Sequence, residues 1–330
     1  MRHLSIADYD AKERSARISA SYPALRCFSA IAFAQVSFPT RVEDERELIR
    51  YADVMQETLS RREHLEERTY SEAEAEAIVK LSGQIRALTG NLYGRTVQPM
   101  MCLFPPLPIL RAVEAIAKAR GRRLRIFEIG PGAGYLGAYL INAGHSYASM
   151  DITQALYLWQ NRLFASIEKD SQEWVHDEGA TAKCIHVPWW QFAHYHEALP
   201  IKADVVICDA ALGEMETLGL FYNLLIARAM IDGSDCAAFM FQHPGEERVN
   251  TLATVEYRLG LSGLIGRRIG GVSIYSLPGR LDDVFARDAT DLPQLGPDGG
   301  RRYAPKSFLP FQESELLESY AFFKYLGLGH

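Results

Sequence analysis

The sequence predicts an α/β protein with a doubly wound, mostly parallel, Rossmann-like sheet and a helical N-terminal region. Two observations support this prediction. From Leu124 onward, short apolar runs of strand length alternate with segments of helical periodicity, as in a parallel sheet covered by helices. One of these runs, "DVVICDA", is continuously apolar at its centre, which is typical of a strand buried on both faces.

Residues 1–120 are expected to form a helical cap or lid. In segment 43–60, apolar residues recur at helical spacing at Leu48, Ala52, Met55 and Leu59. A second helix begins with Ser71 and Glu74, which have the spacing of a capping box. A loop rich in Gly and Pro follows, and then a shorter helix that ends at Gly121.

Residues 121–280 are expected to form the sheet domain. Strands are predicted in "LRIFEIG", "SYASMD", "AKCIHVPW", "ADVVICDAAL" and "CAAFMFQH". Helices are predicted at 134–143, 154–167, 218–230 and 247–261, and a last strand pair in "GRRIGGVSIYSL". Residues 281–330 are expected to run over the surface of the same domain and to end in an amphipathic helix.

Composition restricts the class of partner. A net charge of −6 and a pI near 5.9 provide no general basic field, which argues against nucleic acid as the main partner. No signal peptide or membrane span is visible, and the five cysteines show no C-x-x-C spacing and lie mostly in apolar runs. They are expected to be reduced, in a cytoplasmic protein that binds no membrane. A homodimer is compatible with these features.

The most informative stretch is "LRIFEIGPGAGYLGAYLINAGHSYASMD", from Leu124 to Asp151. Glycines between a strand and a helix allow a sharp turn and a close approach of ligand, and the start of the helix offers free N–H groups. An acid at the end of the next strand, Asp151, is placed to accept hydrogen bonds from ribose. This geometry suits any adenosine cofactor, so both NAD(P) and S-adenosylmethionine are compatible with it.

Three features favour S-adenosylmethionine. Glu128 lies two residues before the first glycine, where a carboxylate repels a pyrophosphate but attracts an ammonium or a sulfonium group. No second mononucleotide-binding half follows. The fourth predicted strand ends in "ICDAALGEME", which places Asp209 and Glu214 at the carboxyl edge of the sheet, where ligands of such folds bind.

The motifs "IFEIGPGAGYLG", "MD" and "ICDAALGEM" resemble those of class I S-adenosylmethionine-dependent methyltransferases. Between Leu124 and His243 the chain is most similar to a family of sugar O-methyltransferases. The resemblance implies cofactor contacts at Glu128, Gly130, Pro131, Gly132, Gly134, Asp151, Ile152 and Asp209. Glu128 would meet the methionine ammonium through water, Asp151 the ribose, and Ile152 the adenine. The sequence departs from the family pattern after the third strand, where "HVPWW" has no acid and Gln191 or backbone groups would recognise adenine.

Methylation of a hydroxyl needs a base to take its proton. His243 is the first candidate, because it follows the fifth predicted strand and histidine titrates near neutral pH. Glu214 is the second, from the resembling Glu-Met signature. His194 and His196 form an H-x-H pair without a third ligand nearby, so no metal site is expected.

Two sets of side chains are candidates for binding the acceptor. Trp189 and Trp190 belong to the densest aromatic cluster of the chain, and aromatic faces stack on sugars and adenine. Tyr93 and Arg95 lie in the Gly/Pro-rich loop, which is expected to line the entrance to the pocket. Two alternatives to a methyltransferase remain at this point. One is an NAD(P)-dependent oxidoreductase that uses GAGYLG, and the other is a methyltransferase-like binding module without activity.

Overall fold

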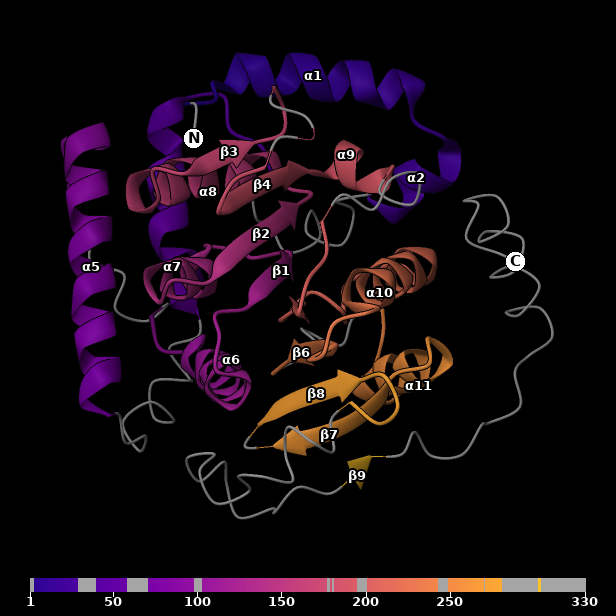
Figure 1. Ribbon diagram of the computed structural model, residues 1–330. Coiled ribbons are helices and arrows are strands. Elements are labelled where there is room, and N and C mark those ends of the chain that lie inside the picture. The colour runs from indigo at the N-terminus through magenta and orange to yellow at the C-terminus, as the bar shows by residue number, and fades with distance from the viewer. Residues whose placement is uncertain are drawn as a thin grey trace.

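The chain folds around a nine-stranded sheet (Figure 1). This computed structural model describes residues 3–28, 40–57, 71–97, 103–176, 179, 181–194, 201–242, 249–269, 271–280 and 302–303. The strands are β1 (Arg125–Ile129), β2 (Ser146–Asp151), β3 (Ser171–Glu173), β4 (Cys184–Pro188), β5 (Val205–Ile207), β6 (Ala238–Phe241), β7 (Ile265–Ile269), β8 (Val272–Ser276) and β9 (Arg302–Tyr303).

The strand order is β3-β4-β2-β1-β5-β6-β8-β7-β9. The first six strands in this order are parallel, whereas β8 lies antiparallel between β6 and β7, and β9 is antiparallel to β7. A parallel sheet ending in such an inserted antiparallel strand is typical of class I methyltransferases and differs from the 3-2-1-4-5-6 order of dinucleotide-binding folds. The predicted fold class is therefore confirmed.

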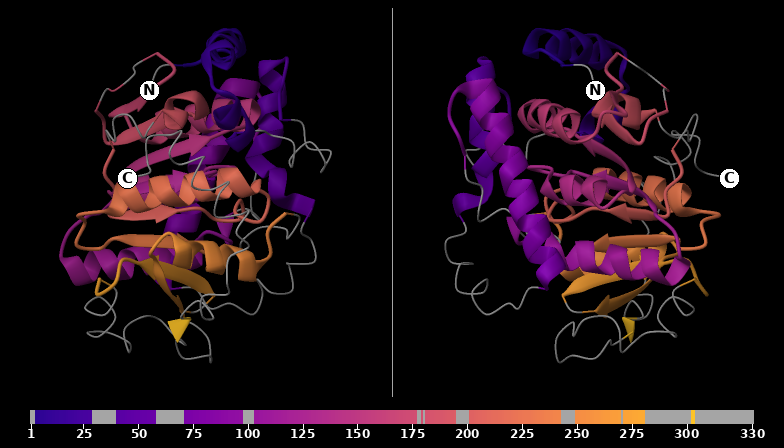
Figure 2. Two further views of the ribbon diagram at one scale, coloured as in Figure 1. Left: turned by 90° about the vertical axis from the view of Figure 1, so that its right-hand side faces the viewer. Right: turned by 60° about the vertical axis from the view of Figure 1, so that its left-hand side comes forward.

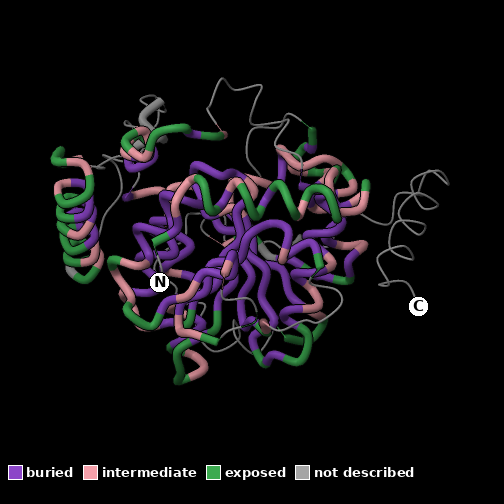
Figure 3. Tube along the Cα trace, turned by 90° about the horizontal axis from the view of Figure 1, so that it is seen from above, coloured by how far each residue is buried: buried purple, intermediate pink, exposed green. Residues whose placement is uncertain are grey.

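Helices cover both faces of the sheet (Figure 2). Their bounds are α1 Ile6–Ser19, α2 Tyr22–Cys27, α5 Glu72–Tyr93, α6 Leu107–Arg120, α7 Tyr135–Asn142, α8 Gln154–Ile167, α9 Trp189–Ala193, α10 Thr217–Ile231 and α11 Leu252–Leu261, with a 3-10 helix η1 at Glu45–Glu57. On one face, α7 and α8 pack on the strands, and α5 lies outside them. Most of the sheet is buried, apart from the first residues of β1 and β2 and part of β7, while the outer faces of the helices are exposed (Figure 3).

Local sequence signals account for most element boundaries. The predicted capping box forms, with the Ser71 hydroxyl accepting from Glu74 N and the Glu74 carboxylate accepting from Ser71 N. Gly121 ends α6 in the left-handed conformation. Segment 45–57 is a 3-10 helix instead of the expected α-helix, and its buried Leu48 and Tyr51 have the three-residue spacing of that helix.

Some predictions lie outside the described residues or are not tested. The closing helix expected after residue 312 is among the undescribed residues, and the predicted domain limits at 120 and 280 stay predictions. Strand β3 was not predicted, because its three residues, Ser-Gln-Glu, carry no apolar run. Among the described helices, none combines the length and the apolar character needed to cross a membrane.

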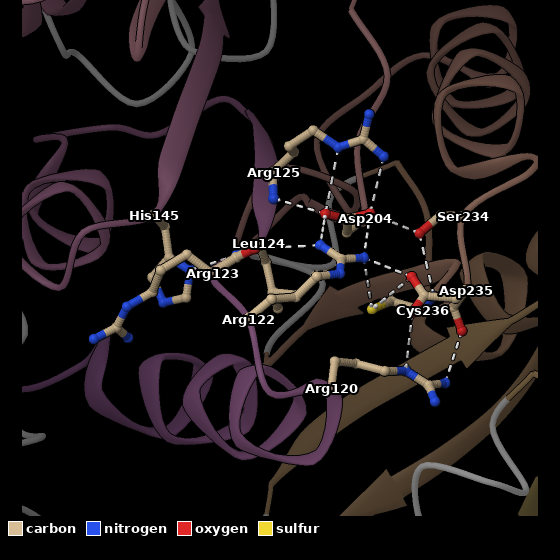
Figure 4. A network of polar contacts seen from close by, with 10 residues as sticks. All are labelled: Arg120, Arg122, Arg123, Leu124, Arg125, His145, Asp204, Ser234, Asp235 and Cys236. Carbon is tan, nitrogen blue, oxygen red and sulfur yellow. Dashed lines mark hydrogen bonds and ion pairs between the residues drawn. The ribbon is translucent and has the colours of Figure 1, made fainter.

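An ion-pair network holds the amino edge of the sheet, opposite the glycine loop (Figure 4). Asp204 is fully buried and accepts hydrogen bonds from Arg122, Arg125 and Ser234. Burial acts to raise the pKa of Asp204, but these hydrogen bonds hold it well below its usual range. Asp204, Asp235 and Cys236 have the spacing of a metal site, yet the Arg122 guanidinium lies 2.8 Å from Asp204 and 2.5 Å from Asp235. A cationic side chain thus already neutralises these acids, and the network is structural.

Candidate cofactor site

The glycine loop between β1 and α7 is built from left-handed backbone. Gly130, Gly132 and Gly134 have φ values of 68°, 57° and 78°, a region that side chains disfavour. A Cβ on Gly134 would lie 3.1 Å from Phe164, so this glycine serves the packing of the loop on α8. A Cβ on Gly132 would meet no atom within 4 Å. The backbone of Gly132 therefore faces open space, as a loop that approaches a ligand requires.

Asp151 ends β2 beside this loop and is buried. Its Oδ1 accepts from Thr153 N at 2.8 Å, and its Oδ2 accepts from Gln160 Nε2 at 2.9 Å. The same Gln160 nitrogen donates to Gly132 O at 2.6 Å. Gln160 of α8 thus connects the acid to the loop. Burial raises the pKa of Asp151 to about 6, although these hydrogen bonds act in the opposite direction.

A buried histidine fixes the orientation of Gln160. His186 Nε2 lies 2.8 Å from Gln160 Oε1, and because that amide oxygen can only accept, the proton is on Nε2. Burial lowers the pKa of His186 to about 3, so the ring is neutral, and it stacks on Tyr157 with centroids 3.7 Å apart. Sequence reasoning missed both Gln160 and His186. The available signal was a polar residue inside an apolar helix and another inside an apolar strand.

Glu128 adds a second carboxyl group beneath the loop. It is 3% exposed and accepts a hydrogen bond from the Tyr147 hydroxyl at 2.6 Å. Burial raises the pKa of Glu128 to about 8; the Tyr147 hydrogen bond lowers it, and the charges of Asp209 and Asp151 raise it further. Among the residues that the structure describes, no basic group contributes to this shift. A cation bound near Glu128 would relieve the repulsion and favour the ionised carboxylate.

Asp209, after β5, supplies the third acid. Its Oδ1 accepts a hydrogen bond at 2.8 Å from the backbone N–H of Gln242, the residue that follows β6. The next residue, Ala210, has a φ of 61°, an unfavourable conformation for a residue with a side chain and one that clusters at functional sites. A Cβ on Gly130 would lie 3.4 Å from Ala211 Cβ, so the turn after β5 packs against the glycine loop. The carboxyl ends of β1, β2 and β5 thus bring together Glu128, Asp151 and Asp209.

The aromatic candidates are more deeply buried than side chains that line an open acceptor pocket. Trp189 and Trp190 are 1% and 7% exposed. Trp189 Nε1 donates to Glu13 at 3.0 Å, and Trp190 packs edge-on against Tyr9. Both therefore lie under α1, and a contact with the acceptor stays a prediction. Ile152 is half-buried next to Asp151, consistent with a place beside adenine.

The remaining candidates have less support. Glu214 is half-buried in the turn after β5, a turn held by Asn250, whose side-chain amide donates to Leu212 O and Met215 O. Tyr93 ends α5, the helix outside α7 and α8, and Arg95 is exposed just after it. Their roles stay predictions.

The candidate histidines add little to the site. His243 and His196 lie outside the described residues, as do Tyr195 and the rest of segment 195–200. His194 is exposed at the end of α9. The role of His243 as a base stays a prediction.

Several solved methyltransferase structures are similar to this chain. The glycopeptide N-methyltransferase MtfA with sinefungin is 14% identical, with a TM-score of 0.37 over 51% of this chain and 86% of the other. Magnesium protoporphyrin IX methyltransferase from Synechocystis PCC 6803 is 14% identical, with a TM-score of 0.36 over 64% and 99%. The O-methyltransferase NcsB1 from neocarzinostatin biosynthesis is 18% identical, with a TM-score of 0.32 over 62% and 67%.

No family model and no curated protein matches the sequence. Because the three TM-scores are all below 0.5 and the identities are 18% or lower, these similarities decide neither the reaction nor the acceptor. The fold assignment rests on the strand order of the chain itself.

Proposed function

We propose that this chain is an S-adenosylmethionine-dependent methyltransferase that acts on a small molecule, with the hydroxyl group of a sugar or a similar compound as the acceptor. The observation that supports this most strongly is the convergence of three carboxyl groups, Glu128, Asp151 and Asp209, near a glycine loop in which Gly132 faces open space. The choice of a hydroxyl acceptor rests on the sequence resemblance.

Electrostatics separate this proposal from a dinucleotide enzyme. A pyrophosphate against the glycines would add negative charge beside Glu128 and Asp151, two buried acids whose pKa values are already raised. Each pKa unit corresponds to about 1.4 kcal/mol between the two protonation states, so a further anion is costly here. S-adenosylmethionine carries an ammonium and a sulfonium group, which the same acids attract. The antiparallel β8 also departs from the dinucleotide-binding strand order.

The residues present fit this cofactor. Asp151 keeps acceptor capacity beyond its hydrogen bonds to Thr153 and Gln160, as ribose hydroxyls require. Gly132 leaves room for the cofactor beside its backbone. When bound, S-adenosylmethionine supplies an activated methyl group. The protein contributes alignment and the exclusion of water, and Glu214 or His243 would accept the proton of the acceptor hydroxyl.

Transfer of a labelled methyl group from S-adenosylmethionine to a panel of sugars, phenols and amines tests the reaction. We expect label on a hydroxyl compound with the wild-type protein and a large loss with Asp151→Asn, which keeps the shape of the side chain but weakens its acceptance from ribose. Asp235→Asn, in the network at the opposite edge, is the matched control and should keep the activity. Cofactor binding without transfer to any member of the panel would favour the inactive binding module.

A further inference from the structure

The N-terminal helix α1 packs against α9 and lies beside the end of the sheet that carries β3 and β4 (Figure 1). Arg162 Nη2 of α8 donates to Leu4 O at 2.6 Å, just before α1 begins. Farther along, Asp10 accepts a hydrogen bond from Nε2 of Gln154 at 2.7 Å. Gln154 is the first residue of α8 and follows Asp151 by three residues in the sequence. Helix α1 therefore runs antiparallel to α8 and reaches the carboxyl end of β2.

The end of β4 meets the same helix. Pro188, the last residue of β4, pairs with Asp151, and the Trp189 indole that follows it donates to Glu13 of α1. Arg41 bridges the two acids of α1 that make these contacts, because its guanidinium lies 2.6 Å from Asp10 and 2.5 Å from Glu13. The carboxyl ends of β2 and β4 are thus covered by one turn of α1, the turn that begins at Tyr9.

Tyr9 is the residue of α1 that enters this space. It is fully buried, with ring centroids 5.2 Å from Tyr157 and 5.1 Å from Trp190. Its hydroxyl has no hydrogen-bond partner among the residues that the structure describes. Buried hydroxyl groups are almost always paired, and an unpaired one calls for a partner that the structure does not contain. A ligand of the protein is such a partner.

The position of the hydroxyl indicates which part of a ligand it meets. Burial raises the pKa of Tyr9 well above its ordinary value, and the charges of Glu13 and Asp151 raise it further. Tyr9 also packs on Trp190, two residues after the Pro188 that pairs with Asp151, so its ring lies near the predicted ribose acceptor. A ribose hydroxyl that donates to Asp151 still has lone pairs, and a tyrosine hydroxyl can donate to them.

We propose that the Tyr9 hydroxyl donates a hydrogen bond to a ribose hydroxyl held by Asp151, so that α1 forms the outer wall of the adenosine site. This inference rests on the proposed function, because it needs an adenosine cofactor at Asp151. It assigns a binding role to the N-terminal helix that the sequence motifs do not indicate.

Tyr9→Phe tests the proposal by removing a single atom. Without ligand, we expect an unchanged or higher Tm, since the lost hydroxyl has no partner in the described structure. The Kd for S-adenosylhomocysteine, measured by calorimetry, should rise about 3- to 10-fold, as expected for one lost neutral hydrogen bond. Tyr222→Phe is the matched control, because its buried hydroxyl donates to Phe192 O and Ala193 O. That variant should lower the Tm and leave the Kd unchanged.

Competition by adenosine, 2′-deoxyadenosine and 3′-deoxyadenosine gives a readout that a structural role of Tyr9 would not change. The wild-type protein should prefer adenosine to at least one deoxy analogue, and Tyr9→Phe should reduce that preference. If Tyr9→Phe binds S-adenosylhomocysteine as tightly as the wild type, the role of Tyr9 is wrong while the proposed function stands. If the folded wild-type protein binds neither S-adenosylhomocysteine nor S-adenosylmethionine, both proposals are wrong.

Discussion

The side-chain amide of Gln160 donates to the carboxylate of Asp151 at 2.9 Å, and the same nitrogen donates to Gly132 O at 2.6 Å. One side chain from α8 therefore sets the distance between the acid after β2 and the loop after β1. Because His186 holds the amide oxygen, rotation of the amide would break all three contacts. We infer that Gln160 positions the two halves of the proposed cofactor site relative to each other.

Gln160→Leu should weaken binding of S-adenosylhomocysteine by about tenfold and lower the free energy of unfolding by about 1–3 kcal/mol, because buried partners lose their hydrogen bonds. Gln84→Leu is a matched control, since Gln84 of α5 also pairs through its amide, with Asn142 at the end of α7. Calorimetry and urea unfolding of both variants separate the two effects. Equal affinity of Gln160→Leu and wild type would contradict the positioning role.

Gly132→Ala should abolish or strongly weaken cofactor binding while destabilising the fold only modestly. The new Cβ meets no protein atom and occupies space proposed for the ligand, and the φ of 57° costs about 1–2 kcal/mol for a residue with a side chain. Gly233→Ala, in the turn after α10, should have a similar conformational cost, because Gly233 has a φ of 83° and its new Cβ would also meet no atom within 4 Å. We expect both variants to lower the Tm by a similar amount. Only Gly132→Ala should lose cofactor binding. Normal binding by Gly132→Ala would place the ligand elsewhere.

The ligand-free protein should lose stability through Glu128 as pH rises. The pKa of Glu128 is raised from 4.5 to about 8 in the folded protein, mainly by burial, so the folded state holds a proton that the unfolded state releases. The resulting stabilisation is complete below about pH 4.5 and is lost as pH rises through about 8. Urea unfolding from pH 5 to 8.5 should show a steeper decline for wild type than for Glu128→Gln. Parallel curves would mean that Glu128 keeps an ordinary pKa.

Affinity for S-adenosylmethionine should change in the opposite direction with pH. A cation is attracted only by the ionised Glu128, so binding to wild type should tighten between pH 6.5 and 8, by at most about tenfold per pH unit. Glu128→Gln should bind more weakly at pH 8 and show a flatter profile. A profile that is the same for both proteins would show that Glu128 does not lie beside the positive charge of the ligand.

Asp204→Asn should destabilise the protein by about 1–3 kcal/mol at pH 7, because the buried side chain loses its charge-assisted hydrogen bonds to Arg122 and Arg125, whose own side chains are partly exposed. The pKa of Asp204 is lowered in the folded protein, so its stabilisation is present above about pH 4 and disappears as pH falls further. The difference between wild type and variant should therefore shrink in urea titrations below pH 4. Cofactor affinity should stay unchanged, and a loss of affinity in a folded variant would contradict a purely structural network.

Local patterns in the sequence were sufficient for much of the fold. Helix α8 has the predicted bounds, 154–167, because its apolar residues recur at helical spacing and its flanks are clear. The strands around Glu128 and Asp151 were predicted from apolar runs beside glycines. Strand β3 was missed, because pairing with β4, and not its own Ser-Gln-Glu sequence, makes it a strand.

The site was predictable only where one motif contained it. The glycine loop and Asp151 lie within one strand–helix–strand unit, so their proximity follows from topology. Gln160, His186 and Tyr9 come from α8, β4 and α1, and no spacing along the chain indicates that they meet. The placement of Trp189 under α1 likewise depends on a contact with Glu13, which is 176 residues away in the sequence.

Calorimetric titration of the wild-type protein with S-adenosylmethionine and, separately, with NAD and NADP tests the central claim most directly. The three acids at the glycine loop predict one binding site for S-adenosylmethionine and no heat with either dinucleotide. Binding of NAD or NADP that is lost in Gly132→Ala, with no heat from S-adenosylmethionine, would contradict the account.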